Sequence, residues 1–295
     1  MTHFSLEHSS DRSGERSRDG AGGGRTTKAF GATIRRWIAL ALAFALLAPF
    51  PAAAKPVAAI VNAYSDDQLI DGFVRTVFGA EAPSQQRMRN LGRVKKFGGR
   101  IRVHVINLAD EDRRAEVMRF LKVLSVSVKN LSMTPTKSKR RAQMIVFLVN
   151  RRDYKSVIDE TLAGMPAASK RSLLKRSACS AVTGGRNGVR LDRSFVYIVA
   201  DEGRSTFRHC MVEEITQSLG PVNDDWHLSA SIYNDSSRVN SFGIFDWYIL
   251  NMLYDHRVKA GMTPTEVRKV LPAAIADARK RLSRLLTSKR INLTN

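Results

Sequence analysis

Two continuous apolar runs stand out between the charged segments of the chain. Residues 143–149 (Gln-Met-Ile-Val-Phe-Leu-Val) and 194–200 (Ser-Phe-Val-Tyr-Ile-Val-Ala) each have the length of one strand. A strand covered on both faces has no polar side, so both runs are predicted as buried strands inside a sheet. Residues 100–106 alternate apolar and polar positions, which predicts a half-buried strand.

Helical spacing of apolar positions occupies much of the rest of the chain. Ser65 and Asp110 are the first residues of two predicted helices, and Thr263-Pro264 opens the last one. The predicted helices span residues 65–77, 110–128, 152–162, 169–174, 204–219, 246–254 and 263–290. Strands alternating with helices indicate one domain, residues 55–290, of mixed α/β or α+β class.

The first 54 residues are organised like an export signal. Residues 1–33 are polar without hydrophobic periodicity, which predicts disorder. Residues 34–54 contain Arg35-Arg36, an apolar run at 37–50 and a terminal Ala52-Ala53-Ala54. A basic start, a short apolar core and small residues at the end are typical of a secretory signal peptide. We expect a periplasmic or secreted protein; an inner-membrane anchor formed by residues 37–50 is the alternative.

Export also bears on the two cysteines of the chain, Cys179 and Cys210. Exported compartments oxidise thiols, so we expect a Cys179–Cys210 disulfide. A crosslink closing a loop of this length stabilises a fold by roughly 3–4 kcal/mol. Two buried free thiols stay open as the alternative, because the sequence does not give their separation.

The chain is strongly basic, with 48 Lys and Arg against 27 Asp and Glu in 295 residues, a net charge of +21. Cleavage after Ala54 would remove seven basic and four acidic residues and leave +18. Such charge suggests an anionic partner. Export, and the lack of any aromatic–basic recognition motif, argue against nucleic acid. We expect an anionic cell-envelope component or an envelope protein.

The C-terminal helix, residues 263–290, carries part of this charge. Leu271, Ile275, Leu282 and Leu285 recur along it with basic residues between them. Two interpretations stay open. Either the helix packs its apolar side into the domain, or it makes peripheral contact with a membrane surface.

A short acidic run inside the helix at 204–219 is the most informative stretch. Glu213 and Gln217 are four residues apart and share one helical face, and Glu214 lies about 100° around the same turn. Gly220 permits a sharp turn, after which Asn223 could return toward that face. The run reads Cys210-Met-Val-Glu-Glu-Ile-Thr-Gln-Ser-Leu-Gly220.

This spacing resembles the His-Glu-x-x-His-x-x-Gly-x-x-His motif of metzincin-type zinc peptidases. Glu213, Gln217 and Asn223 stand where that motif has its three histidines, while Glu214 and Gly220 match it. The resemblance implies a zincin-like mixed sheet with a degenerate active-site helix and C-terminal helices. It also places Glu214 in the general-base position. The methionine turn of those peptidases is not matched, since Ile232 or Tyr233 stands there.

A closer resemblance covers about residues 100–267. Its motifs are Cys-x-x-Glu-Glu-x-x-Gln-x-Leu-Gly at 210–220, Ser-Ile-Tyr-Asn-Asp at 231–235, Leu-Tyr-Asp at 253–255 and Gly-Met-Thr at 261–263. Together they are similar to a proteobacterial family of unknown function whose members are expected to be exported or lipoproteins. That resemblance supplies no activity.

Three functions stay open. Conventional zinc proteolysis is disfavoured, because amide oxygens bind zinc weakly, although His209 or His227 could replace a ligand. A hydrolase could use Glu213 and Glu214 as acid and base, or hold a divalent cation among oxygen ligands. Its metal ligands would be Glu213, Gln217 and Asn223, with Asp224, His227 and Asp235 as second choices. We favour a non-catalytic scaffold that binds an envelope partner, with no cofactor identified.

Overall fold

The structure is a computed structural model in which residues 56–78, 92–174, 178–223, 225, 227–228, 231–234, 239–291 and 293 are described. The predicted disordered segment and signal peptide lie outside the described residues. The chain divides into two units, Met1–Ala54 and Lys55–Asn295, and everything below concerns the second. Among the described residues, no helix combines the length and apolar character needed to cross a membrane.

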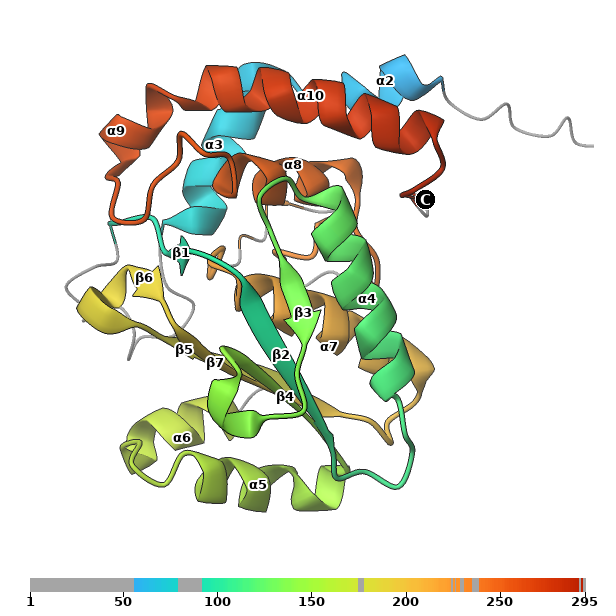
Figure 1. The fold of residues 1–295 in the computed structure, drawn as a ribbon, viewed down its shortest axis with the longest axis vertical. Coiled ribbons are helices and arrows are strands. Elements are labelled where there is room, and N and C mark those ends of the chain that lie inside the picture. Colours follow the sequence, from blue (N-terminus) through green and yellow to red (C-terminus); the bar gives the residue numbers. More distant parts are fainter. Residues whose placement is uncertain are drawn as a thin grey trace, which may run out of the picture. The chain divides into compact units, whose positions relative to one another are not determined.

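A five-stranded mixed sheet lies at the centre of this unit, with strand order β3-β2-β4-β7-β5 (Figure 1). β2, β3, β4 and β7 run parallel, and β5 runs antiparallel to β7. All six residues of β4 are buried, which confirms the prediction of a central strand. The strands are β2 (Ile101–Asn107), β3 (Met133–Pro135), β4 (Met144–Val149), β5 (Cys179–Gly184) and β7 (Arg193–Val199).

The two edge strands, β3 and β5, are absent from the sequence predictions. β3 has three residues and ends in Pro135, and β5 is built largely from small residues. Neither segment has the apolar run or the alternation that predicts a strand, so their pairing depends on a neighbouring strand already in place. A two-stranded parallel ribbon, β1 (Lys96–Phe97) with β6 (Arg190–Leu191), is also short and was not predicted.

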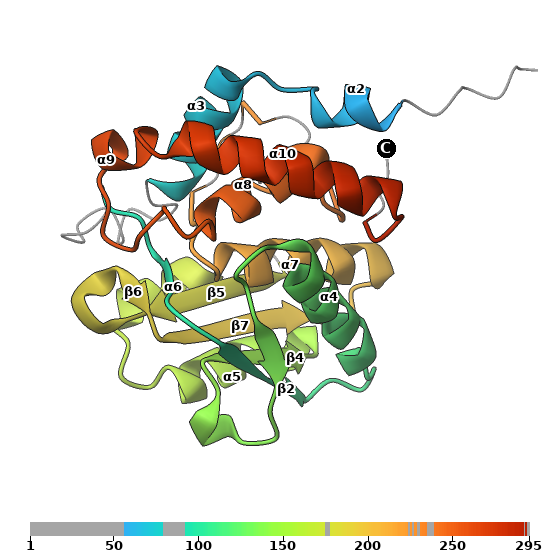
Figure 2. The same ribbon diagram turned by 45° about the horizontal axis from the view of Figure 1, so that its top comes forward.

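Helices cover both faces of the sheet (Figure 2). α5 and α6 lie on one face, and α4 and α7 lie on the other. α2, α3, α8, α9 and α10 form a further layer beyond α7. The helices are α2 (Val57–Val61), α3 (Asp66–Val77), α4 (Arg114–Ser127), α5 (Tyr154–Thr161), α6 (Ala167–Leu174), α7 (Arg204–Gln217), α8 (Ile244–Leu253), α9 (Pro264–Arg268) and α10 (Leu271–Thr287). This is the mixed α/β class expected from the sequence.

The predicted helix at 263–290 is two helices, which corrects its extent. Thr263 caps α9, and its hydroxyl accepts a hydrogen bond from the Glu266 amide. Pro272 lies in the first turn of α10. Proline has no amide hydrogen, and its ring clashes with the carbonyl four residues earlier, so a continuous helix through this point is disfavoured.

α10 uses its apolar side inside the domain. Leu271, Ile275, Leu282 and Leu285 are buried in the common core. The structure therefore bears out the interpretation as a packed helix with a basic outer side. An amphipathic membrane helix would need that apolar side for the bilayer.

Candidate functional site

α7 carries the acidic run and is buried on all sides over its second half. Glu213, Glu214 and Gln217 are only 6%, 2% and 4% exposed. The helix begins just after β7 and lies between the sheet and α8 (Figure 2). Carboxyl groups are rarely enclosed unless they are paired or bonded. The run is therefore an internal polar cluster rather than a solvated helix face.

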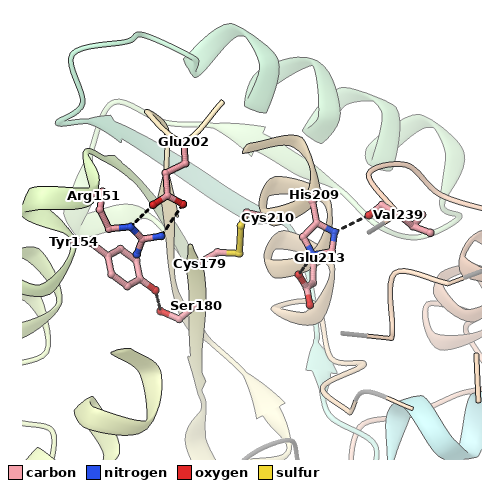
Figure 3. Close-up of a disulfide and its surroundings, with 9 residues drawn as sticks. All are labelled: Arg151, Tyr154, Cys179, Ser180, Glu202, His209, Cys210, Glu213 and Val239. Atoms are coloured by element: carbon pink, nitrogen blue, oxygen red, sulfur yellow. Dashed lines mark hydrogen bonds and ion pairs between the residues drawn. A yellow bond between two sulfur atoms is a disulfide. The ribbon is translucent and has the colours of Figure 1, made fainter. Parts of the chain in front are cut away.

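The predicted Cys179–Cys210 disulfide is confirmed. It joins the edge strand β5 to α7 with 5.6 Å between the Cα atoms (Figure 3). Both cysteines are buried. The crosslink therefore fixes the antiparallel strand against the helix that bears the acidic run.

Glu213 is paired with a histidine one turn earlier on α7. The His209 Nε2 atom lies 3.1 Å from Glu213 Oε2. The other ring nitrogen, Nδ1, donates to the Val239 carbonyl oxygen at 2.7 Å (Figure 3). A carbonyl oxygen only accepts, so Nδ1 must carry a hydrogen. A second proton must then lie between Nε2 and the carboxylate, either on an imidazolium or on the carboxylic acid.

The second carboxyl lies beside the same disulfide. Atoms of Cys179, Glu213 and Glu214 lie within 4.8 Å of one another, the one such group of three metal-ligating side chains among the described residues. Cys179 is bound in the disulfide, so its sulfur is not a thiolate and cannot serve as a strong metal ligand. What remains is two enclosed carboxyl groups, one of them already paired with His209.

Asn223 and His227 have partners elsewhere in the structure. The Asn223 side-chain amide donates to the Arg75 carbonyl at 2.8 Å, and the Asn223 backbone amide donates to the Thr76 carbonyl at 3.1 Å. Asn223 therefore holds the end of α3. The His227 Nδ1 atom lies 2.6 Å from Asp225 Oδ1, and His227 is in no three-membered ligand group within the described part of the chain.

Asp224 and Asp235, the remaining second choices for a metal ligand, lie outside the described residues. The structure thus brings Glu213 and Glu214 together and gives Asn223 and His227 other roles.

Gly220 ends the acidic run in a conformation that excludes other residues. Its φ of +135° lies in the region that side chains rarely adopt. An added Cβ atom would stand 2.1 Å from the Lys95 carbonyl oxygen. The chain can therefore turn at this point and pass close to the segment before β1 only with glycine here.

A buried carboxylate that the sequence analysis missed fixes the turn that contains Ser231 and Ile232. Asp246, at the start of α8, accepts hydrogen bonds from the Ser231 hydroxyl at 2.5 Å, the Ile232 amide at 3.3 Å and the Gly243 amide at 2.8 Å. Burial raises the pKa of Asp246 to about 7, although these hydrogen bonds act in the opposite direction. The structure makes Asp246 the third residue of α8, a position typical of helix capping, whereas the predicted helix at 246–254 begins with it.

The His209–Glu213 pair should contribute measurably to stability. We expect Glu213→Gln and His209→Gln each to lower the free energy of unfolding, with a coupling of about 1.5–3 kcal/mol in a double-mutant cycle, as for hydrogen bonds to charged groups. Urea unfolding near pH 6 of the parent, the two single variants and the double variant measures this coupling. Strictly additive single effects would contradict the pairing.

No curated protein matches the chain. A family described as "Protein of unknown function (DUF2927)" matches residues 66–273, a range that contains α7, the disulfide, the Ser231–Asn234 turn and α8. Because this match spans most of the chain, the protein belongs to the DUF2927 family.

Proposed function

We propose that this protein is an exported binding scaffold of the cell envelope, with a zincin-like domain that does not catalyse metal-dependent hydrolysis. One observation carries the proposal. The Glu213 carboxyl, which stands in the position of a zinc ligand, is engaged by His209, and His209 is held in turn by the Val239 carbonyl. At least this donor of the degenerate motif is therefore used to hold the protein together.

Two further observations support a zincin-like scaffold. α7 directly follows β7, which is a strand of a mixed sheet. The disulfide joins α7 to β5, the antiparallel edge strand of that sheet. The acidic run on α7 keeps the Glu-x-x-x-x-x-Gly spacing of the metzincin motif through Glu214 and Gly220. The histidines that would bind zinc are replaced by weaker or engaged groups.

Export is supported by the disulfide and by the residues that precede the domain. Buried disulfides persist in oxidising compartments and are rare in reducing ones. Residues 34–54 have the composition of a signal peptide. We propose that the protein is periplasmic or secreted and that it binds an anionic partner in the cell envelope.

A hydrolase is the second candidate, favoured by the proximity of two carboxyl groups. Glu213 and Glu214 belong to one group of atoms within 4.8 Å. In an enclosed pair of carboxyl groups, one group can keep its proton and act as an acid while the other ionises and acts as a base. The reason is that two adjacent negative charges repel each other. In this alternative, Glu214 is the general base and a divalent cation lies among oxygen ligands.

Elemental analysis together with a peptide-hydrolysis assay separates the two candidates. For the scaffold, we expect less than about 0.1 equivalent of zinc, calcium or magnesium after loading and dialysis, since weak oxygen donors lose a metal readily. Any residual hydrolysis should be unchanged in Glu214→Gln. Stoichiometric metal, or a loss of hydrolysis of about 100-fold or more in Glu214→Gln, would establish the hydrolase instead.

A further inference from the structure

The two ends of the parallel strands differ sharply in charge. At the carboxyl ends of β2, β4 and β7, basic and acidic side chains neutralise each other. The ion pairs there include Arg113–Glu111, Arg114–Asp112, Arg151–Glu202 and Arg152–Asp110.

The opposite end of the sheet holds a group of exposed cations. We call this group the amino-edge cluster, and it consists of Arg100, Arg102, Lys137, Lys139, Arg140 and Arg141. Among the described residues, none of the six takes part in an ion pair. Unneutralised cations concentrated at one edge create a local positive potential that attracts anions.

Backbone pairing places the starts of β2, β4 and β7 side by side at this edge. The Gln143 amide donates to the Arg102 carbonyl at 2.9 Å, and the Ser194 amide donates to the Gln143 carbonyl at 2.7 Å. The Arg193 guanidinium bonds the Ala142 carbonyl at 2.9 Å, on the β7 side. Because neighbouring strands are about 4.8 Å apart, the cations of the β2 start and of the loop before β4 share one surface.

We infer that the amino-edge cluster is the surface through which the protein attaches to the anionic headgroups of a membrane. The inference deepens the proposed function, and it rests on export for its choice of partner. Each Lys or Arg near an anionic bilayer contributes about 1 kcal/mol, so six can support reversible attachment without apolar insertion.

The chemistry of this edge favours lipid headgroups over single-stranded nucleic acid. Surfaces that bind single strands combine cations with exposed aromatic rings on which bases stack. Here the Phe147 ring is buried beneath Lys139, at 5.7 Å from its Nζ atom, and Arg193 covers Phe195. The exposed large hydrophobic side chains of the described region are Leu108, Val123 and Val126, none of which belongs to this edge.

Vesicle co-sedimentation with the purified, processed protein tests the inference. Vesicles of phosphatidylcholine alone are compared with vesicles containing 30% phosphatidylglycerol at about 50 and 200 mM salt. We expect binding only to the anionic vesicles and weaker binding at high salt, because ions screen exposed charges. Equal binding to both vesicle types, or binding to neither, would overturn the inference.

A matched pair of variants locates the surface. The first variant replaces Lys137, Lys139, Arg140 and Arg141 with glutamine. The control replaces the exposed Lys280, Arg284, Lys289 and Arg290 and so removes the same charge from the C-terminal region. We expect the first variant to bind anionic vesicles at least about tenfold more weakly, and the control to bind within about threefold of the parent.

Equal losses in the two variants would contradict the assignment of the surface. Duplex DNA is the competing partner, so DNA binding that is tighter than vesicle binding at the same salt would also overturn it. Matching thermal unfolding of all three proteins confirms that they are folded. These outcomes do not depend on metal content or hydrolysis, so failure here and failure of the proposed function can be told apart.

Discussion

Replacing both Cys179 and Cys210 with alanine will lower the free energy of unfolding by about 3–4 kcal/mol. The crosslink spans 31 residues and joins β5 to α7. A loop of that size restricts the unfolded chain, which raises the free energy of the unfolded state relative to the folded one. Urea unfolding curves of the parent and the double variant measure the difference.

Reduction provides the control for this prediction. Reductant under partly unfolding conditions should shift the parent curve toward that of the double variant and leave the double variant unchanged. The disulfide also positions β5, an edge strand that lacks strong strand propensity. In the double variant, β5 should therefore lose amide-exchange protection before β4 does. A double variant as stable as the parent would contradict both the energetic and the positioning roles of the crosslink.

The sequence was sufficient for the elements that carry their own hydrophobic signal. β4 was predicted because every one of its positions is apolar, and α3 because Ser65 and the acidic residues after it are typical of a helix start. β3 and β5 could not be predicted. Their residues become strands only because β2 and β7 offer unpaired edges, a tertiary effect that no local pattern contains.

The candidate site was predictable in its residues but not in its internal bonding. The spacing on α7 identified Glu213, Glu214 and Gln217, and export favoured the disulfide. The sequence suggests His209 as a replacement metal ligand, whereas the structure pairs it with Glu213. The four-residue spacing of His209 and Glu213 was the available signal. The Val239 carbonyl that orients the imidazole comes from a loop distant in the sequence, and no sequence pattern indicates this contact.

Stability should fall as the pH rises from about 4 to about 7, and Asp246 should account for much of that fall. Its pKa is near 3.8 in an unfolded chain and about 7 in the folded protein, because burial disfavours the carboxylate. Across this range the folded state keeps a proton that the unfolded state has released. Raising the pH therefore favours unfolding, by up to about 4 kcal/mol over the whole range. Below about pH 4 both states are protonated, so the contribution is complete there.

Asp246→Asn should remove this part of the pH dependence. Asparagine cannot ionise, yet its carbonyl can still accept from the Ser231 hydroxyl and the Ile232 amide. The variant loses the acceptor for the Gly243 amide, a cost of about 1 kcal/mol that does not vary with pH. At pH 4.5 it should be less stable than the parent, whereas by pH 7.5 the difference should shrink or reverse. Urea unfolding at intervals of half a pH unit measures both curves.

Asp277→Asn is the matched control, because the same substitution there has the opposite electrostatic consequence. The Arg257 guanidinium hydrogen-bonded to Asp277 holds the pKa of this partly exposed carboxyl below its usual value. Its stabilising contribution is therefore present above the unfolded pKa and is lost as the pH falls. Asp277→Asn should leave the slope between pH 4.5 and 7.5 essentially unchanged. Parallel curves for the parent and Asp246→Asn would show that Asp246 stays ionised inside the fold. Its three hydrogen bonds would then outweigh the cost of burial.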